Sequence, residues 1–95
     1  MENRKIVRAN GAGVFFGDVV EEKGNAVVME NARRLWYWDG AASLSELAQY
    51  GTARPENCKF PCPVDRVKVL NVLEILDVTE EAAKSIDGVP EWKRR

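Results

Sequence analysis

The chain has 95 residues, of which 45% are hydrophobic and 31% are charged, and its formal net charge is -1. This length is typical of a single small domain spanning residues 1–95, and the composition excludes a disordered chain. The charge balance argues against binding to bulk DNA through a general positive field.

The chain shows no sign of a membrane or export segment. No apolar run approaches the roughly 20 residues that a membrane-spanning helix needs, and the start "MENRKIVRAN" lacks the apolar core of a signal peptide. We therefore expect a cytosolic protein with no membrane partner.

The first part of the chain is rich in β-branched and aromatic residues and is interrupted by glycine-containing turns such as "NGAG" and "EEKGN". This pattern predicts strands at residues 5–8, 14–21, 26–30 and 33–38. We expect them to pair as antiparallel hairpins.

The pattern changes after Gly40, where two helices are predicted. Ser43 followed three residues later by Glu46 is a capping box, and Gly51 is a C-cap signal that ends this first helix. Thr79 caps a second helix that ends at Gly88, with acidic residues in its first turn. The proline-rich segment "TARPENCKFPCP" between them predicts a loop.

Residues 66–78, "RVKVLNVLEILDV", form the clearest strand pattern, with Asn71 interrupting its apolar face. Together these elements predict an α+β fold in which a small antiparallel sheet of about five strands carries two short helices. A domain of this size buries a modest core, so we also expect it to be oligomeric.

Cysteine and histidine usage limits the chemistry. Cys58 and Cys62 form a single C-x3-C pair, and the chain has no histidine to complete a tetrahedral metal site. We expect two free thiols, no metal and no cofactor. A thiol-based enzyme that uses one of these cysteines is a weaker alternative, because histidine, the commonest general base, is absent.

The run "RRLWYW" at residues 33–38 places two arginines beside three large aromatic residues. On a strand, alternation would put Arg34 and Trp36 on one face and Arg33 on the other. A guanidinium beside an exposed ring suits a nucleotide, because it binds phosphate oxygens while the ring stacks on the base. Equally, the tryptophans can belong to the core and the arginines to its rim.

Three other positions can complete such a site. Arg8 precedes the turn "NGAG", whose glycines allow close backbone approach to a ligand, although a hairpin turn with a solvated arginine explains it as well. Phe60 lies in the proline-bounded loop as either a stacking ring or a core residue. Asn71 needs a hydrogen-bond partner, either the backbone or the edge of a base.

Three segments of the sequence resemble a family of small phage-encoded proteins, the Thoeris anti-defence sponges. These segments are "VRANGAGVFFGDV", "NARRLWYWDGAASLSELA" and "CKFPCPVDRVKVLNVLEIL". The resemblance implies a protein that binds cyclic ADP-ribose isomers, or cyclic oligonucleotides at separate sites, and sequesters them in the bacterial host cytosol. It also implies that the chain is no enzyme and assembles into homo-oligomers up to hexamers.

Carried onto this sequence, the resemblance assigns roles to particular residues. Arg8 with one or both of Arg33 and Arg34 would surround the diphosphate, Phe60 would stack on adenine, and Asn71 would bond to a polar ligand edge.

Two other functions are compatible with the same residues. A phage structural or interaction module would use the aromatic run as a protein-binding surface and would bind no nucleotide. A binder of single-stranded nucleic acid would use the rings for stacking, for which the net charge of -1 is unfavourable.

Overall fold

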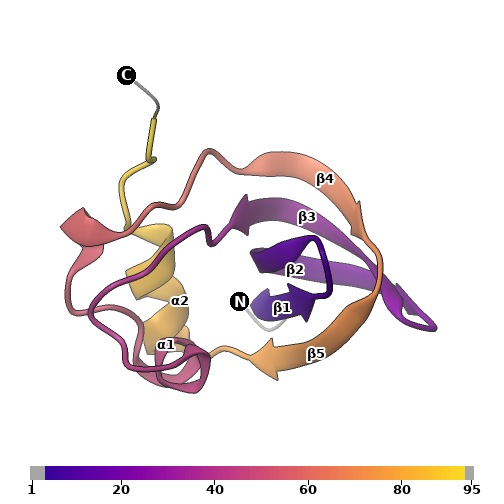
Figure 1. The fold of residues 1–95 in the computed structure, drawn as a ribbon, viewed down its shortest axis with the longest axis horizontal. Coiled ribbons are helices and arrows are strands. Elements are labelled where there is room, and N and C mark those ends of the chain that lie inside the picture. The colour runs from indigo at the N-terminus through magenta and orange to yellow at the C-terminus, as the bar shows by residue number, and fades with distance from the viewer. Residues whose placement is uncertain (1–3, 94–95) are drawn as a thin grey trace.

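The computed structural model describes residues 4–93, which form a five-stranded antiparallel sheet and two short helices that pack at one side of it (Figure 1). In chain order the elements are β1 (Arg4–Ala9), β2 (Gly13–Lys23), β3 (Ala26–Arg34), α1 (Leu44–Tyr50), the short 3-10 turn η1 (Pro55–Asn57), β4 (Val64–Val69), β5 (Val72–Asp77) and α2 (Glu80–Asp87). The predicted fold of about five strands and two helices is confirmed. Within residues 4–93, no helix is long and apolar enough to cross a membrane.

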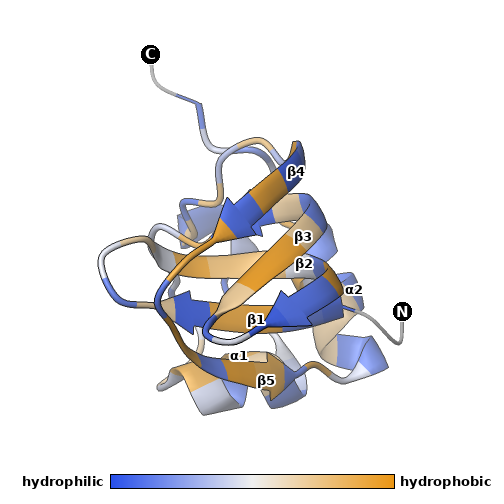
Figure 2. Cartoon of the chain, turned by 90° about the vertical axis from the view of Figure 1, so that its right-hand side faces the viewer, coloured by the Kyte–Doolittle hydropathy of each residue, from blue (hydrophilic) through white to orange (hydrophobic). Residues whose placement is uncertain are grey.

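The sheet curls because β4 and β5, which follow each other directly in the chain, lie at its opposite edges. The strand order is β4-β3-β2-β1-β5, although only Leu70 and Asn71 separate β4 from β5. Figure 2 shows this short connection passing along one side of the sheet, from β4 at the top to β5 at the bottom. Asn71 has a φ of 59°, the left-handed conformation that asparagine adopts more readily than most residues. The result is a small, partly closed barrel.

Irregularities in the pairing of β2 with β3 allow this curvature. This pairing shifts register between Phe16 and Asp18 and again between Val19 and Glu21, and such bulges bend a strand. Gly17 lies opposite the first bulge, which Asn31 and Ala32 form on β3, and a Cβ atom at Gly17 would lie 2.8 Å from the Ala32 Cα. The close approach of β3 at the bend therefore requires glycine.

A buried hydrophobic cluster lies on each side of the curled sheet, and β1 contributes to both because its alternate side chains point to opposite sides. Ile6 joins the cluster between the sheet and the helices, whereas Val7 joins the cluster inside the curl. The first cluster comprises Ile6, Phe16, Leu35, Leu47, Ala48, Cys58, Phe60, Ala83, Ile86 and Val89. The second comprises Val7, Ala9, Phe15, Val27, Met29, Ala32 and Val69.

Both predicted helices begin at the residues that their caps indicate. The Ser43 Oγ accepts a hydrogen bond from the Glu46 N–H at 3.1 Å, and the Gly51 N–H closes the helix on the Leu47 carbonyl. The Thr79 Oγ1 likewise accepts from the Ala82 N–H at 3.0 Å. These caps satisfy backbone groups that would otherwise lack partners at the helix ends.

Two predicted strands are wrong in extent. Residues 33–38 do not form a strand of their own, because β3 runs on to Arg34 and only Tyr37 makes a further isolated bridge, with Lys59. Residues 66–78 are divided into β4 and β5, because Asn71 turns the chain from one sheet edge to the other.

Candidate functional site

The aromatic run leaves the sheet along an irregular path that is tied to the loop before β4. The main-chain N–H groups of Trp36 and Tyr37 donate to the Lys59 carbonyl at 3.1 and 3.3 Å, and the Lys59 N–H donates to the Tyr37 carbonyl at 2.8 Å. Leu35 is buried, whereas Trp36 is 66% and Tyr37 50% exposed. The backbone bonds therefore fix two large rings on the surface.

A compact hydrogen-bonded turn follows the aromatic run. The Asp39 carboxylate accepts hydrogen bonds from the Asn57 side chain at 3.0 Å and from the Gly40 N–H at 2.8 Å. Both bonds favour the ionised form, first that from Asn57, so the pKa of Asp39 lies below its ordinary value. Gly40 has a φ of 83°, and a Cβ atom there would lie 2.5 Å from the Arg54 nitrogen. This turn holds the end of the aromatic run in place.

The Arg33 side chain points into the protein, where it is hydrogen-bonded to main-chain carbonyl groups. Only 5% of the residue is exposed, and its guanidinium donates to the carbonyls of Phe60 (2.9 Å), Pro61 (3.1 Å) and Ile86 (3.1 Å). Burial lowers the pKa of this guanidinium from its ordinary value. Arg33 thus connects the last turn of α2, where a positive charge is favourable, to the loop before β4.

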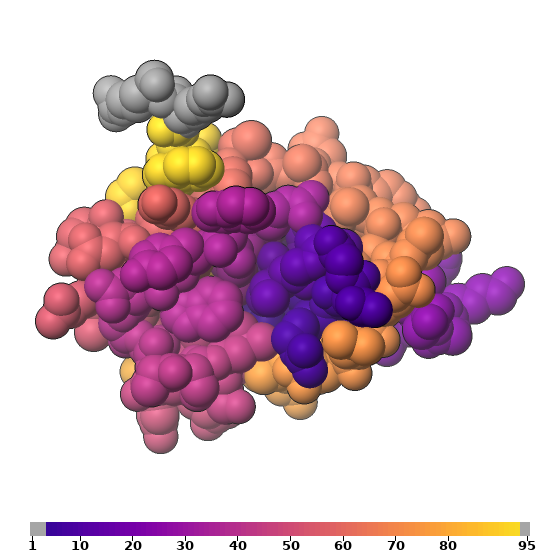
Figure 3. Space-filling view, in the orientation of Figure 1, coloured from indigo at the N-terminus to yellow at the C-terminus, as the bar shows by residue number. Residues whose placement is uncertain are grey.

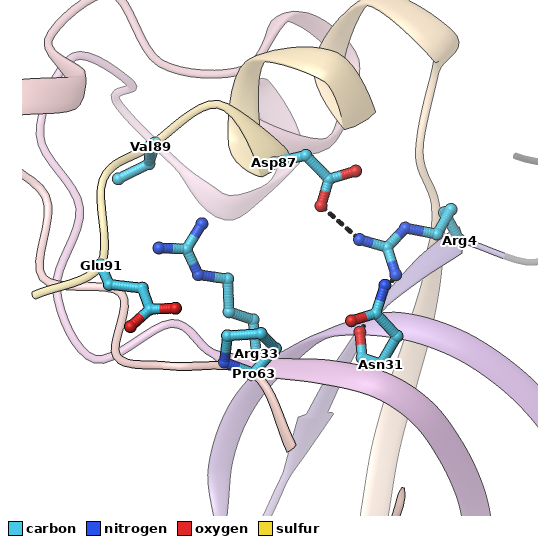
Figure 4. Close-up of a pocket in the computed structure, with 7 residues that line it drawn as sticks. All are labelled: Arg4, Asn31, Arg33, Pro63, Asp87, Val89 and Glu91. Atoms are coloured by element: carbon cyan, nitrogen blue, oxygen red, sulfur yellow. Dashed lines mark hydrogen bonds and ion pairs between the residues drawn. The ribbon is translucent and has the colours of Figure 1, made fainter. Parts of the chain in front are cut away.

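Arg33 also borders a cleft of about 160 Å³ (Figure 4). Arg4, which is 6% exposed, lines the same cleft, bonds to the Asn31 carbonyl at 3.1 Å and pairs with the Asp87 carboxylate. The full lining consists of Arg4, Asn31, Arg33, Pro63, Asp87, Val89 and Glu91.

Arg34, one residue further along the chain, points to the other side of the sheet. Its guanidinium donates to the Ala12 carbonyl at 2.8 Å and lies 4.4 Å from the centre of the Phe15 ring. No carboxylate among residues 4–93 lies within 4.0 Å of it. The Arg34 guanidinium therefore lies over the cluster inside the curled sheet and carries an exposed positive charge without a carboxylate partner in this range.

Three surface depressions meet at Arg34. One of about 290 Å³ is lined by Trp36, Trp38 and the turn at residues 11–13. A second, of about 430 Å³, lies on the other side of the same turn and includes Lys68 and Asn71. A third, of about 340 Å³, extends along β3 and β4 towards Cys62. In Figure 3 the indigo turn lies between the magenta segment near residue 40 and the orange segment near residue 70.

We call the surface around these depressions the Arg34 face. It consists of Gly11, Ala12, Gly13, Arg34, Trp36, Trp38, Lys68 and Asn71. Both glycines have positive φ, and a Cβ atom at either would meet no atom within 4 Å, so the backbone of the turn is open to a ligand.

The structure brings together three of the six residues that the sequence indicated, namely Arg34, Trp36 and Asn71. Arg8 is paired with Glu74 of β5 at 3.0 Å and lines none of the three depressions. Arg33 lies in the separate cleft. Phe60 is fully buried in the core, so its ring presents no face for stacking, and its predicted role is corrected accordingly.

Sequence reasoning missed Lys68 and Arg4. Lys68 and Asn71 lie near each other in the chain, but only the left-handed turn at Asn71 shows that they border the same depression. The partner of Arg4, Asp87, is 83 residues away. No local pattern indicates such a pair.

The two cysteines are both free thiols. Cys58 is buried, with its sulfur 3.6 Å from the Asp39 carbonyl oxygen, whereas Cys62 is exposed. The described part of the chain contains no group of three or more histidine, cysteine or acidic residues positioned to hold a metal ion.

Comparison with known proteins places the chain in a family without assigning an activity. No curated protein and no solved structure matches it. The model of a family described as a domain of unknown function (DUF6948) matches residues 2–86, which is most of the chain. The chain therefore belongs to the DUF6948 family.

Proposed function

We propose that this protein binds a small phosphate-bearing nucleotide at the Arg34 face and holds it without cleaving it. The observation that carries the proposal is the Arg34 guanidinium, which is exposed and lacks a carboxylate partner among residues 4–93. It lies between a depression lined by Trp36 and Trp38 and one that includes Lys68 and Asn71. A phosphate would bind Arg34 and the amides of the glycine turn, because guanidinium groups and exposed backbone N–H groups are common phosphate ligands.

The two sides of the face suit the remaining parts of a nucleotide. Trp36 offers an exposed ring on which a base can stack, and Asn71 and Lys68 offer donors to polar groups on the opposite side. The resemblance of the sequence to the Thoeris anti-defence sponges favours cyclic ADP-ribose isomers and cyclic oligonucleotides as ligands. In this proposal the protein sequesters such a signal in the bacterial host cytosol.

The energetics support an oligomer. Charge-assisted hydrogen bonds contribute about 1.5 to 3 kcal/mol each and base stacking about 1 to 3 kcal/mol, against an association cost of at least about 4 kcal/mol. One Arg34 face, with one arginine and one well-exposed ring, therefore supports binding in the range of about a millimolar rather than nanomolar binding. Sequestration of a scarce signal requires further contacts, which a neighbouring copy of the chain would supply. We accordingly propose a homo-oligomer with shared sites, up to a hexamer.

Calorimetry against cyclic ADP-ribose isomers and cyclic di- and trinucleotides tests this function. Saturable binding, loss of at least about tenfold in affinity in Arg34→Gln, and recovery of the ligand with unchanged mass are expected. Arg8→Gln is the matched control, because Arg8 is also exposed but lies outside the depressions. Absence of binding, or an equal loss in both variants, contradicts the proposal. Native mass spectrometry of the same samples measures the number of subunits.

The exposed aromatic residues favour a second candidate, a protein-interaction module. Trp36, Tyr37, Tyr50 and Trp92 are between 41% and 66% exposed, and the Lys59 ammonium lies 5.8 and 5.6 Å from the ring centres of Tyr37 and Trp92. Aromatic residues with such exposure are typical of interface hot spots. A Trp92→Ala variant separates the two functions, because Trp92 lines no part of the Arg34 face and its loss would leave nucleotide binding unchanged.

A further inference from the structure

The cleft beside Arg33 is independent of the Arg34 face. It opens between the start of β1, the bulge at Asn31, the end of α2 and the segment that follows α2 (Figure 4). None of its lining residues contributes to the three depressions around Arg34. Its volume of about 160 Å³ is well below the roughly 300 to 1,000 Å³ of sites for drug-sized ligands, so it suits a much smaller molecule.

One wall of the cleft carries a buried positive charge without a close counterion. The three hydrogen bonds of Arg33 all go to neutral carbonyl groups, and two of the five N–H groups of a guanidinium are not used in them. No carboxylate in the described range 4–93 lies within 4.0 Å of this guanidinium. Burying a charge away from water is costly unless an opposite charge compensates it.

Arg4 differs in this respect. It pairs with Asp87, and a second acid, Asp18, lies 3.7 Å away. Arg33 is therefore the arginine on this wall that lacks a carboxylate in direct contact, and Glu91 and Asp87 act on it only from a longer distance. A ligand carboxylate would provide a closer counterion.

The remaining charged groups of the cleft are two carboxylates, Asp87 and Glu91, and Arg4, which is paired with Asp87. Figure 4 shows the Arg33 guanidinium between Glu91 on one side and Asp87 on the other. A simple anion that approached Arg33 would be repelled by these two carboxylates, and a simple cation would be repelled by Arg33. A molecule that carries both charges avoids both conflicts.

We propose that this cleft binds a small zwitterion with a carboxylate and an ammonium group, the chemistry of a free amino acid. The carboxylate bonds to Arg33, and the ammonium lies against Glu91 and Asp87. Pro63 and Val89 form the apolar part of the wall and leave room for a short side chain.

Amide chemical-shift titration of the whole protein tests this assignment with three probes: glycine, acetate and methylammonium. Glycine should produce saturable shifts at residue 31 and residues 87–91, with an affinity about tenfold higher than that of either single-charge probe, since each lacks one charged contact. Shifts at residues 11–13 and 68–71 instead, or no saturable shift with glycine, would overturn it.

A charge-neutralising substitution at the rim provides the decisive comparison without disturbing the core. Glu91→Gln should weaken glycine binding severalfold and leave acetate binding unchanged or stronger, because it removes the ammonium contact together with the repulsion of anions. Glu56→Gln is the control, since Glu56 is equally exposed and lies outside the cleft. Acetate binding as tightly as glycine in the unmodified protein would identify an anion site and refute the zwitterion.

Discussion

The two adjacent arginines provide a paired test of the structure. Arg33→Gln removes three hydrogen bonds to main-chain carbonyls, and the shorter glutamine side chain cannot replace them together. Each of these hydrogen bonds from a charged group contributes about 1.5 to 3 kcal/mol, and the relief of burying a charge offsets part of the sum. We expect a net loss of about 3 kcal/mol in the free energy of unfolding.

Arg34→Gln should have a much smaller effect on stability. It removes one exposed hydrogen bond to Ala12 and a contact with the Phe15 ring that is worth about 0.5 to 1 kcal/mol at exposed sites. The expected loss is below about 2 kcal/mol, since the exposed hydrogen bond contributes a similarly small amount. Both variants change the net charge equally, so the difference between them reports the environments of the two side chains.

Urea denaturation followed by fluorescence of the three tryptophans measures both losses. For a domain of this size, 1 kcal/mol corresponds to about 4 to 8 °C in melting temperature, so Arg33→Gln should melt about 12 to 24 °C lower than the unmodified protein. Equal losses in the two variants, or a larger loss for Arg34→Gln, would refute the assignment of Arg33 to the interior and Arg34 to the surface.

Three further predictions follow from local contacts. Gly51→Ala should lower the free energy of unfolding by about 2 to 4 kcal/mol in the same urea assay, because its Cβ would lie 2.3 Å from the Ser85 Cβ and its φ is 78°; a change below about 1 kcal/mol would show that α1 can move away from α2. The pKa of Asp39 is lower in the folded than in the unfolded state, so its stabilising contribution is present above its ordinary pKa of 3.8 and is lost as the pH falls through the folded-state value. Asp39→Asn should therefore make the urea midpoint less dependent on pH below about 4, and an unchanged pH profile would contradict the bonding described for this carboxylate. Iodoacetamide should modify Cys62 before Cys58 when the reaction is followed by peptide mass spectrometry, because only Cys62 is exposed; equal rates would indicate that the loop before β4 opens readily.

The parts of the fold that local chemistry determines were predicted from the sequence. Ser43 and Thr79 mark helix starts because a hydroxyl and the amide three residues later form the cap wherever the helix packs. The hairpin strands follow from alternation and glycine turns. The division of the last strand was not predicted, because an apolar strand pattern that contains Asn71 does not reveal that the chain changes sheet edge there.

The candidate site was predicted in part for a related reason. Alternation correctly separated Arg33 from Arg34, but it could not show which of the two faces is covered by helices. Phe60 could equally be a core residue or a stacking ring, and only its position beneath the helices settles its burial. Long-range packing therefore decided which of the candidate residues remain accessible.

The position of β1 between β2 and β5 has a consequence for how the chain folds. Lys5 pairs with Asp77, so the contact that completes the sheet joins residues 72 positions apart. Contacts of such long range slow folding, because a long loop must be closed before they form. During synthesis, the N-terminal strand must wait for nearly the whole chain before its second neighbour is available. Until then one edge of β1 stays unpaired, and such an edge can pair with another chain.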